Sequence, residues 1–236
     1  MAIPLERLDG PLLAGKRVVI LADFDGTVSM RDVQVSYLDK YARPDWRQAE
    51  AKILAEGKKS AHYLPVIYKG FRASREELLG FIDAEMRLDP DFPGFVAFCR
   101  DHGFHLEITS DGLDFYIRFL LAKYGVEVPF ISNRADFGPE GVRLSHPYFN
   151  AGCGKCGSCK KSRLERLRGP ETIIIYVGNL STDLCPAQEA DIVFAKAQLL
   201  SFCRQERIPC IPFEGFADVR RTLEKFLYLA GSVDKL

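Results

Sequence analysis

Short apolar runs alternate with longer amphipathic segments over most of the chain. Residues 17–22 and 172–177 are continuous apolar runs rich in valine and isoleucine. Such runs are typical of strands buried on both faces of a parallel sheet. Shorter runs predict further strands, and helical patterns lie between them; these runs are 104–109, 130–131, 192–194 and 210–211. The alternation predicts an α/β fold: a Rossmann-like three-layer α/β/α core built on a parallel sheet.

The alternation is interrupted over residues 31–91, where helical patterns occur and no convincing strand does. Ser74 followed by Glu77 forms a capping box, a typical start of a helix. We therefore predict an inserted all-helical cap over 31–91. The remaining segments, 1–30 and 92–236, would form the core.

Three segments outside the cap carry more specific predictions. Gly138 to Gly141 predicts a hairpin-like turn within an otherwise ambiguous stretch, 134–149. A basic helix is predicted over 160–167, and a terminal helix over 216–229.

Composition narrows the possible partners. The 236 residues hold 32 Lys and Arg against 32 Asp and Glu, so there is no excess positive charge to bind nucleic acid or an anionic membrane. No apolar run approaches the roughly 18 residues of a membrane span. Residues 1–15 lack the basic and apolar regions of a secretion signal. We expect a cytoplasmic protein that binds neither nucleic acid nor membrane.

The first predicted strand stops abruptly on polar residues. Asp23, Asp25 and Thr27 follow it at spacings of two, with Gly26 between the last pair. A turn would account for Asp25 and Gly26, because both types favour turns, but not for Asp23 or Thr27. Two carboxylates beside an apolar strand destabilise the fold. They can serve as a nucleophile and an acid/base pair, or hold a metal ion.

Two later strands also end on polar groups. Ser110 follows the second strand, and Asn179 follows the strand at 172–177, with Asp183 four residues later. Lys160 opens the helix before that strand. In open α/β sheets, ligands bind beyond the carboxyl ends of the strands. The set supplies the carboxylates, hydroxyl, cation and oxygen ligands that phosphoryl transfer requires.

In these residues the chain resembles the haloacid dehalogenase superfamily of phosphohydrolases. Four motifs occur in that superfamily's order: Asp23-Phe24-Asp25-Gly26-Thr27, Ser110, Lys160, and the stretch 178–183. The placement of the cap is similar to that of the phosphoserine-phosphatase-like subgroup. Three segments of the second half resemble the methionine-salvage phosphatase (MtnX) family: 110–116, 156–160 and 183–196.

The resemblance implies a role for each motif. Asp23 would attack phosphorus and form an aspartyl-phosphate, and Asp25 would protonate the leaving oxygen and then activate water. Lys160 would neutralise the phosphoryl group. The phosphate oxygens would be held by Thr27, Ser110 and a backbone N–H near Asp111.

The same resemblance implies a Mg²⁺ cofactor. Its ligands would come from Asp23, the backbone carbonyl of Asp25, Asn179 and Asp183. The superfamily usually has aspartate at position 179, so this chain departs from its pattern. An amide oxygen can bind Mg²⁺ but brings no negative charge. We expect a weakened metal site with retained activity.

The implied function is hydrolysis of a small phosphorylated metabolite. The methionine-salvage resemblance points to 2-hydroxy-3-keto-5-methylthiopentenyl-1-phosphate. Two alternatives stay open: a phosphoserine- or phosphocholine-type phosphomonoesterase, and a catalytically weak protein that binds a metal or ligand. The pattern does not predict an oligomeric state.

Cys153, Cys156 and Cys159 have the spacing of metal ligands. A structural Zn²⁺ would need a fourth ligand, such as His146 or Cys185. Three reduced thiols in a glycine-rich loop are the alternative.

Overall fold

The computed structural model describes residues 12–13 and 15–228. Across these residues, seven strands form a sheet in the order β4-β3-β2-β1-β5-β6-β7. The pairings β1–β2, β1–β5, β5–β6 and β6–β7 are parallel, and β3–β4 is antiparallel. The predicted α/β fold with a mostly parallel sheet is thus confirmed. The strands are β1 (Arg17–Ala22), β2 (His105–Leu113), β3 (Phe130–Gly138), β4 (Gly141–Ser145), β5 (Thr172–Gly178), β6 (Ile192–Ala195) and β7 (Ile211–Pro212).

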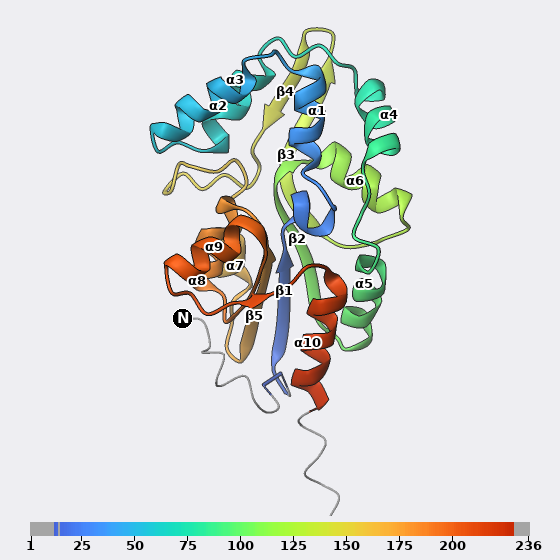
Figure 1. The fold of residues 1–236 in the computed structure, drawn as a ribbon, viewed down its shortest axis with the longest axis vertical. Coiled ribbons are helices and arrows are strands. Elements are labelled where there is room, and N and C mark those ends of the chain that lie inside the picture. The colour runs from blue at the N-terminus through green and yellow to red at the C-terminus, as the bar shows by residue number, and fades with distance from the viewer. Residues whose placement is uncertain (1–11, 14, 229–236) are drawn as a thin grey trace, which may run out of the picture. The chain divides into compact units, whose positions relative to one another are not determined.

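The chain forms two compact units, each described here separately. Of the described residues, the first unit holds 12–13 and 15–23, Asp89–Ile108 and 160–228; the second holds Phe24–Leu88 and Thr109–Cys159. The first unit contains helices α5 (Phe92–Asp101), α7 (Lys160–Leu167), α8 (Leu184–Glu189), α9 (Ala197–Gln205) and α10 (Phe216–Tyr228), with the short turn η3 (Ser181–Asp183). The second contains the turn η2 (Phe24–Val28) and helices α1 (Val33–Tyr41), α2 (Trp46–Ala55), α3 (Ser60–Tyr68), α4 (Arg75–Glu85) and α6 (Asp114–Lys123). Figure 1 shows both sets of elements.

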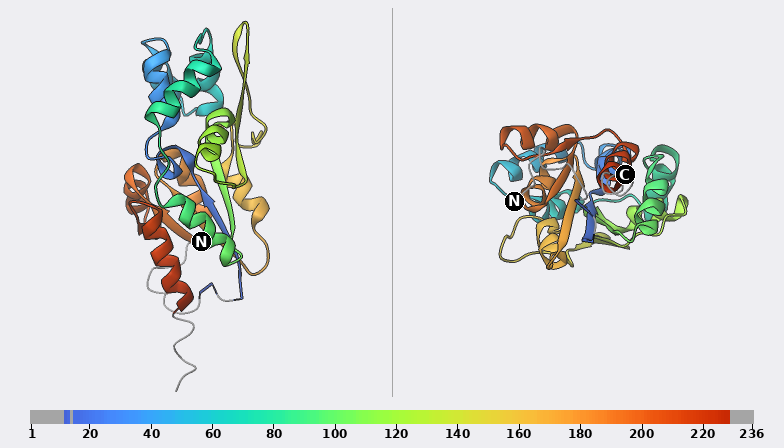
Figure 2. Two further views of the ribbon diagram at one scale, coloured as in Figure 1. Left: turned by 90° about the vertical axis from the view of Figure 1, so that its right-hand side faces the viewer. Right: turned by 90° about the horizontal axis from the view of Figure 1, so that it is seen from below.

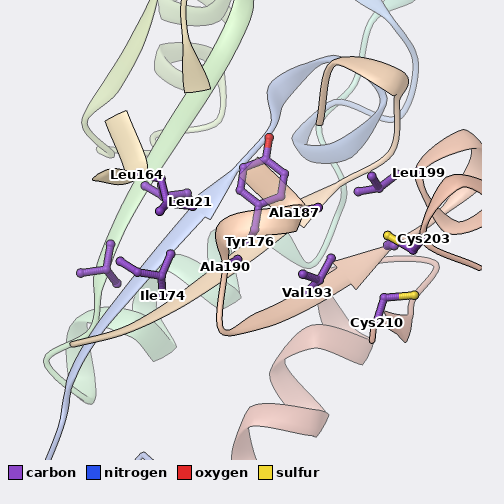
Figure 3. Close-up of a cluster of buried hydrophobic side chains, with 12 residues drawn as sticks. Leu21, Leu164, Ile174, Tyr176, Ala187, Ala190, Val193, Leu199, Cys203 and Cys210 are labelled. Carbon is purple, nitrogen blue, oxygen red and sulfur yellow. The ribbon is translucent and has the colours of Figure 1, made fainter. Parts of the chain in front are cut away.

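In the first unit, one face of the sheet is covered by α7, α8 and α9. Their inward residues Leu164, Ala187 and Leu199 pack with buried strand residues in one cluster, shown in Figure 3. The strand members alternate along each strand, as one face of a sheet requires; they are Val19, Leu21, Ile174, Tyr176, Val193 and Ala195. Tyr176 is the large polar member of this cluster, and its ring extends from β5 toward the carboxyl end of the strand.

The other side of this unit carries α5 and α10 (Figures 1 and 2). Their contact is aromatic: the ring centroid of Phe216 lies 4.7 Å from that of Phe92 and 5.0 Å from that of Phe95. Burying rings of this size is a large hydrophobic contribution to stability. The strands of the first unit are therefore held between two layers of helix, which fixes the positions of their carboxyl ends.

The second unit combines helices with the β3–β4 hairpin (Figure 2). An aromatic cluster lies within this unit. The ring centroid of Tyr37 lies 6.4 Å from that of Phe71, 6.0 Å from that of Phe115 and 6.0 Å from that of Tyr116. The hydroxyls of Tyr37 and Tyr68 are hydrogen-bonded to each other. Aromatic residues of α1, α3 and α6 and the residue Phe71 thus pack together in this unit.

Several local predictions are confirmed. Ser74 Oγ accepts from the backbone N–H of Glu77, whose carboxylate accepts from the N–H of Ser74, so the capping box begins α4. The helix predicted over 160–167 is α7. The predicted hairpin joins β3 to β4, with Gly138 paired to Gly141.

Two strands are longer than predicted. The second strand continues to Leu113, so Ser110 lies inside β2 instead of after it. Pairing with β4 extends the third strand to Gly138. The sequence did not indicate this pairing partner because neither stretch is strongly apolar.

Some predictions fall outside the described residues or stay predictions. The interpretation of the N-terminus rests mainly on residues 1–11 and 14, and the predicted end of the terminal helix is residue 229; all lie outside the described part. The boundaries of a cap over 31–91 and a core over 1–30 and 92–236 stay predictions. Among the described residues, no helix has the length and apolar character needed to cross a membrane.

Candidate active site

Asp23 is positioned by the ladder between β1 and β5. Ala22 lies opposite Val177, and the backbone N–H of Asp23 donates to the carbonyl of Val177 at 2.9 Å. This parallel pairing places Asp23 at the same edge of the sheet as Asn179, the residue after β5. The side chain of Asp23 is buried, with 3% of the residue exposed. A carboxylate in such a place requires a compensating charge.

Lys160 supplies that charge. Its Nζ lies 2.5 Å from Asp23 Oδ1 and 2.6 Å from Asp183 Oδ1. The residue is 4% exposed and is the first residue of α7. Burial by itself lowers the pKa of Lys160, but the carboxylates of Asp183 and Asp23 outweigh burial and raise its pKa well above the ordinary value. Lys160 is therefore a fixed cation between two buried carboxylates.

Asp183 is fully buried, and its carboxylate accepts hydrogen bonds from four donors. Oδ1 accepts from Lys160 Nζ and from the hydroxyl of Tyr176, both at 2.6 Å. Oδ2 accepts from the backbone N–H groups of Asn179 and Leu180, both at 2.9 Å. A carboxylate has about four acceptor sites, so these donors account for its capacity. This arrangement favours a role for Asp183 in holding Lys160 and the loop after β5.

The last residue of β5 is the glycine Gly178, for a steric reason. A Cβ at Gly178 would lie 2.6 Å from Asp183 Oδ2 and 2.9 Å from a ring carbon of Tyr176. Real Cβ atoms essentially never approach heavy atoms this closely. Glycine at this position lets the Asp183 carboxylate lie against the backbone.

The side-chain amide of Asn179 offers an oxygen atom suited to bind a metal ion. Asn179 is 7% exposed, and its Oδ1 has no hydrogen-bond partner among the described residues. A buried carbonyl oxygen without a partner is costly, unless a ligand completes it. Asp23 and Asn179 both offer hard oxygen atoms, and Mg²⁺ is typically held by one or two protein oxygens together with water and substrate. These two residues of the first unit therefore fit a Mg²⁺ ion.

In the second unit, the residues after Asp23 form the tight turn η2. Gly26 has a φ of 74°, a left-handed conformation that glycine adopts without strain. Ser29 closes the turn, because its Oγ donates to the carbonyl of Phe24 at 2.9 Å and accepts from the N–H of Gly26 at 3.2 Å. Thr27 is fully buried, and its Oγ1 has no hydrogen-bond partner among the described residues.

The carboxyl group of Asp25 is held by two donors of the second unit. Oδ1 accepts from the backbone N–H of Val33, at the start of α1, at 2.9 Å. Oδ2 accepts from the hydroxyl of Tyr116 at 2.6 Å. Tyr116 belongs to the segment of resemblance at 110–116, but its contact with Asp25 could not be predicted from the sequence, because the two residues are 91 positions apart.

Ser110 and Asp111 lie on β2 and serve the second unit differently. Ser110 Oγ accepts from the backbone N–H of Gly112 at 3.0 Å. Asp111 Oδ1 accepts from the N–H of Ser158 at 2.9 Å, and Oδ2 from the hydroxyl of Ser60. The side chain of Asp111 thus ties the loop before Lys160 and the start of α3 to β2.

Each unit therefore contains part of the predicted set. The first unit gathers Asp23, Lys160, Asn179 and Asp183, and the second contains Asp25, Thr27, Ser110 and Asp111. Tyr176 and Tyr116 are the additional residues that the structure adds, one in each unit. Neither was given a role from the sequence, because each resembles an ordinary core aromatic residue.

The predicted Zn²⁺ site is not supported. Among the described residues, no group of three or more His, Cys, Asp or Glu side chains is arranged to hold a metal ion. Cys153 is exposed, and Cys156 and Cys159 are half-buried. His146, a predicted fourth ligand, uses its Nδ1 in a 2.7 Å hydrogen bond to Asn133 Oδ1. The loop has hydrogen bonds within the second unit: the N–H of Gly157 donates to Ser60 Oγ at 2.9 Å, and the N–H of Cys159 donates to the carbonyl of Tyr148 at 3.0 Å.

The mostly parallel α/β sheet and the buried charged groups after its strands describe the class of the fold, and comparison with known proteins identifies the family. The chain belongs to the haloacid dehalogenase-like hydrolases, whose family profile matches residues 20–188.

Two curated relatives are similar over most of their length. A 2-hydroxy-3-keto-5-methylthiopentenyl-1-phosphate phosphatase of Geobacillus kaustophilus is 33% identical over 219 residues, covering 89% of this chain and 97% of the relative. A protein of the same name from Brevibacillus brevis is 32% identical, covering 89% and 96%.

Solved structures share the fold at low sequence identity. A substrate-bound phosphoserine phosphatase complex has a TM-score of 0.64 at 15% identity, covering 87% of this chain and 98% of that one. A probable phosphoserine phosphatase from Vibrio cholerae has a TM-score of 0.69 at 16% identity, covering 94% and 68%.

Proposed function

We propose that this chain is a Mg²⁺-dependent phosphatase that hydrolyses a small phosphomonoester through an aspartyl-phosphate. The observation that carries the proposal is the buried Lys160, whose Nζ lies 2.5 Å from Asp23 Oδ1 and 2.6 Å from Asp183 Oδ1. A buried ammonium next to a carboxylate is suited to neutralise the charge that develops when that carboxylate attacks a phosphoryl group. Asp183 would keep Lys160 in place.

The reaction would take two steps. In the first, an oxygen of Asp23 forms a bond to phosphorus while the bond to the leaving oxygen breaks, and Asp25 gives that oxygen a proton. In the second, Asp25 takes a proton from water, whose oxygen attacks phosphorus and releases inorganic phosphate and the free carboxylate of Asp23. Thr27, Ser110 and a backbone N–H near Asp111 would bind the phosphate oxygens.

Mg²⁺ would be held by Asp23 and Asn179, together with the carbonyl of Asp25. When bound, it neutralises phosphate charge and orients the phosphoryl group. Asp183 belongs to the ligand set suggested by the sequence. Its four hydrogen bonds favour instead an indirect contribution, through Lys160 and the Asn179 backbone.

The substrate proposed first is 2-hydroxy-3-keto-5-methylthiopentenyl-1-phosphate, because two relatives at 32–33% identity carry the name of its phosphatase. Phosphoserine and phosphocholine are the comparison substrates. A cytoplasmic location and a cap with boundaries at 31 and 91 stay predictions.

Turnover of p-nitrophenyl phosphate by the purified chain, with Mg²⁺ and with EDTA, tests the reaction class. Asp23→Asn is the control, since it removes the nucleophile at nearly constant volume. We expect Mg²⁺-dependent turnover that this variant loses. A panel containing the three phosphomonoesters then ranks the substrates by kcat/KM. No turnover, together with no binding of beryllofluoride, would leave the catalytically weak metal- or ligand-binding protein as the better description, a reading that the amide at position 179 favours.

A further inference from the structure

Tyr116 forms a hydrogen bond to the carboxyl group of Asp25 in addition to the packing of its ring. The hydroxyl of Tyr116 donates to Asp25 Oδ2 at 2.6 Å, and the tyrosine is fully buried. The N–H of Val33 donates to the other carboxyl oxygen at 2.9 Å. Donors on both oxygens fix the plane of a carboxyl group, which otherwise rotates about its side-chain torsions.

Gly112 makes this contact possible. A Cβ at position 112 would lie 1.7 Å from the Tyr116 hydroxyl oxygen and 2.6 Å from Asp25 Oδ2. Any other residue at this position would occupy the space where the two side chains meet. Gly112 lies in β2 and is not in the left-handed region, so close approach is the reason for glycine here.

Surrounding rings hold the Tyr116 side chain. Its ring centroid lies 5.9 Å from Phe24, 6.0 Å from Tyr37 and 5.4 Å from Phe115. In the same cluster, the hydroxyls of Tyr37 and Tyr68 are hydrogen-bonded to each other. The cluster thus contains one phenol pair that is structural and one phenol that is bonded to a carboxyl group.

We infer that Tyr116 is a positioning residue, which holds the Asp25 carboxyl group in the orientation needed to give a proton to the leaving oxygen. This inference rests on the proposed phosphatase function. Tyr116 forms no bond to the substrate in this scheme; it acts through Asp25. Without this hydroxyl, the carboxyl group keeps the Val33 contact but loses the Tyr116 donor on Oδ2, so it is oriented less firmly and proton transfer becomes less frequent.

The basicity of the leaving group separates this role from a purely structural one. An alkoxide is a poor leaving group and needs the proton, whereas p-nitrophenolate leaves readily without it. Tyr116→Phe should therefore lower kcat/KM by roughly tenfold to a hundredfold for glycerol 2-phosphate, and by only about twofold or threefold for p-nitrophenyl phosphate. Most of the loss should be in kcat, with KM nearly constant.

Tyr68→Phe is the matched control, because it removes a buried phenolic hydroxyl of the same unit that is hydrogen-bonded to Tyr37 instead of to a carboxyl group. Its ratio of the two kcat/KM values should equal that of the wild type, even if its stability falls. Gly112→Ala is the second variant if Tyr116→Phe proves too unstable to assay. It keeps the phenol but crowds its oxygen, and it should change the ratio in the same direction.

Each outcome has a definite meaning. Equal losses on both substrates in Tyr116→Phe, or the same change of ratio in Tyr68→Phe, would overturn the role of Tyr116 while the phosphatase function stands. A wild-type protein that hydrolyses neither substrate overturns the proposed function, and the role of Tyr116 with it, before any variant is compared.

Discussion

Lys160 Nζ lies 2.6 Å from Asp183 Oδ1, and the same nitrogen lies 2.5 Å from Asp23 Oδ1. One buried ammonium is therefore shared between a carboxylate that follows β1 and one that follows β5. Asp183 also accepts from Tyr176 and from two backbone N–H groups, so it is the fixed partner. The position of Lys160 near the proposed nucleophile depends on this second carboxylate.

Asp183→Asn should destabilise the fold, because it removes one charged partner of a buried pair and leaves four donors facing an amide. We expect a loss of about 3 kcal/mol in the free energy of unfolding, measured by urea denaturation. The variant should also lose most of its phosphatase turnover. Asp45→Asn is the control, since Asp45 pairs with Arg43 on the exposed surface, and its loss should be below about 1 kcal/mol. Similar losses in both variants would contradict the fixed role of Asp183.

Asn179→Asp should strengthen Mg²⁺ binding by roughly tenfold, because affinity for a hard cation rises with the number of charged ligands. Isothermal titration calorimetry measures this directly, and Mg²⁺ should raise the melting temperature of the variant more than that of the wild type. Asn150→Asp adds the same charge in a loop of the second unit, where Asn150 Oδ1 accepts from the N–H of Gly152. An affinity unchanged in Asn179→Asp would mean that the amide oxygen does not bind the metal ion.

The buried tyrosines predict a loss of stability in alkaline solution. Burial is the main cause that raises the pKa of Tyr37, Tyr116 and Tyr176 well above 10. The unfolded chain releases these phenol protons near pH 10, whereas the folded chain keeps them. Stability is therefore complete below pH 10 and falls as the pH rises above it, by up to about 1.4 kcal/mol per pH unit for each tyrosine.

Urea denaturation at pH 8, 9.5 and 10.5 checks this dependence, and absorbance at 295 nm reports the phenolate. Tyr176→Phe should reduce the slope of the unfolding free energy against pH, above pH 10, by the contribution of one phenol. Phenolate formation by these tyrosines before the protein unfolds would contradict the expectation.

Gly112→Ala and Gly80→Ala should have opposite effects on stability. At position 112 the new methyl group would meet the Tyr116 hydroxyl and the Asp25 carboxyl group, and we expect a loss of about 1–3 kcal/mol. At position 80, inside α4, nothing lies within 4 Å of an added Cβ. Alanine there should stabilise the protein by about 0.5–1 kcal/mol, because glycine is a poor helix former. A neutral result at Gly112 would show that the Tyr116–Asp25 contact is easily displaced.

The sequence predicted the sheet well where local pattern and burial agree. The buried strands at 17–22 and 172–177 are continuous apolar runs rich in β-branched residues. The capping box joins Ser74 to Glu77, only three residues later, so it depends on local sequence alone. Predictions were poorer where a strand depends on its partner. β3 is longer than its apolar start because β4 pairs with its polar half.

The chemical identity of the proposed site was also readable from the chain, since Asp23, Asp25, Lys160 and Asn179 follow the order of a known family. The hydrogen bonds that each of these groups makes could not be read from the sequence. Asp183 has the spacing of a metal ligand in the sequence, but the structure fills its oxygens with donors from Lys160, Tyr176 and the backbone.

By itself, the sequence determined the fold class, the carboxylates after the first strand and the departure at Asn179, because these depend on residue type and local order. Only the tertiary structure decided that Lys160 is shared by Asp23 and Asp183, and that Tyr116 meets Asp25 over Gly112. These contacts join residues 137, 23 and 91 positions apart. Such pairs depend on how strands and helices pack. The hydrophobic pattern of the sequence does not show which buried tyrosine directs its hydroxyl to a carboxyl group.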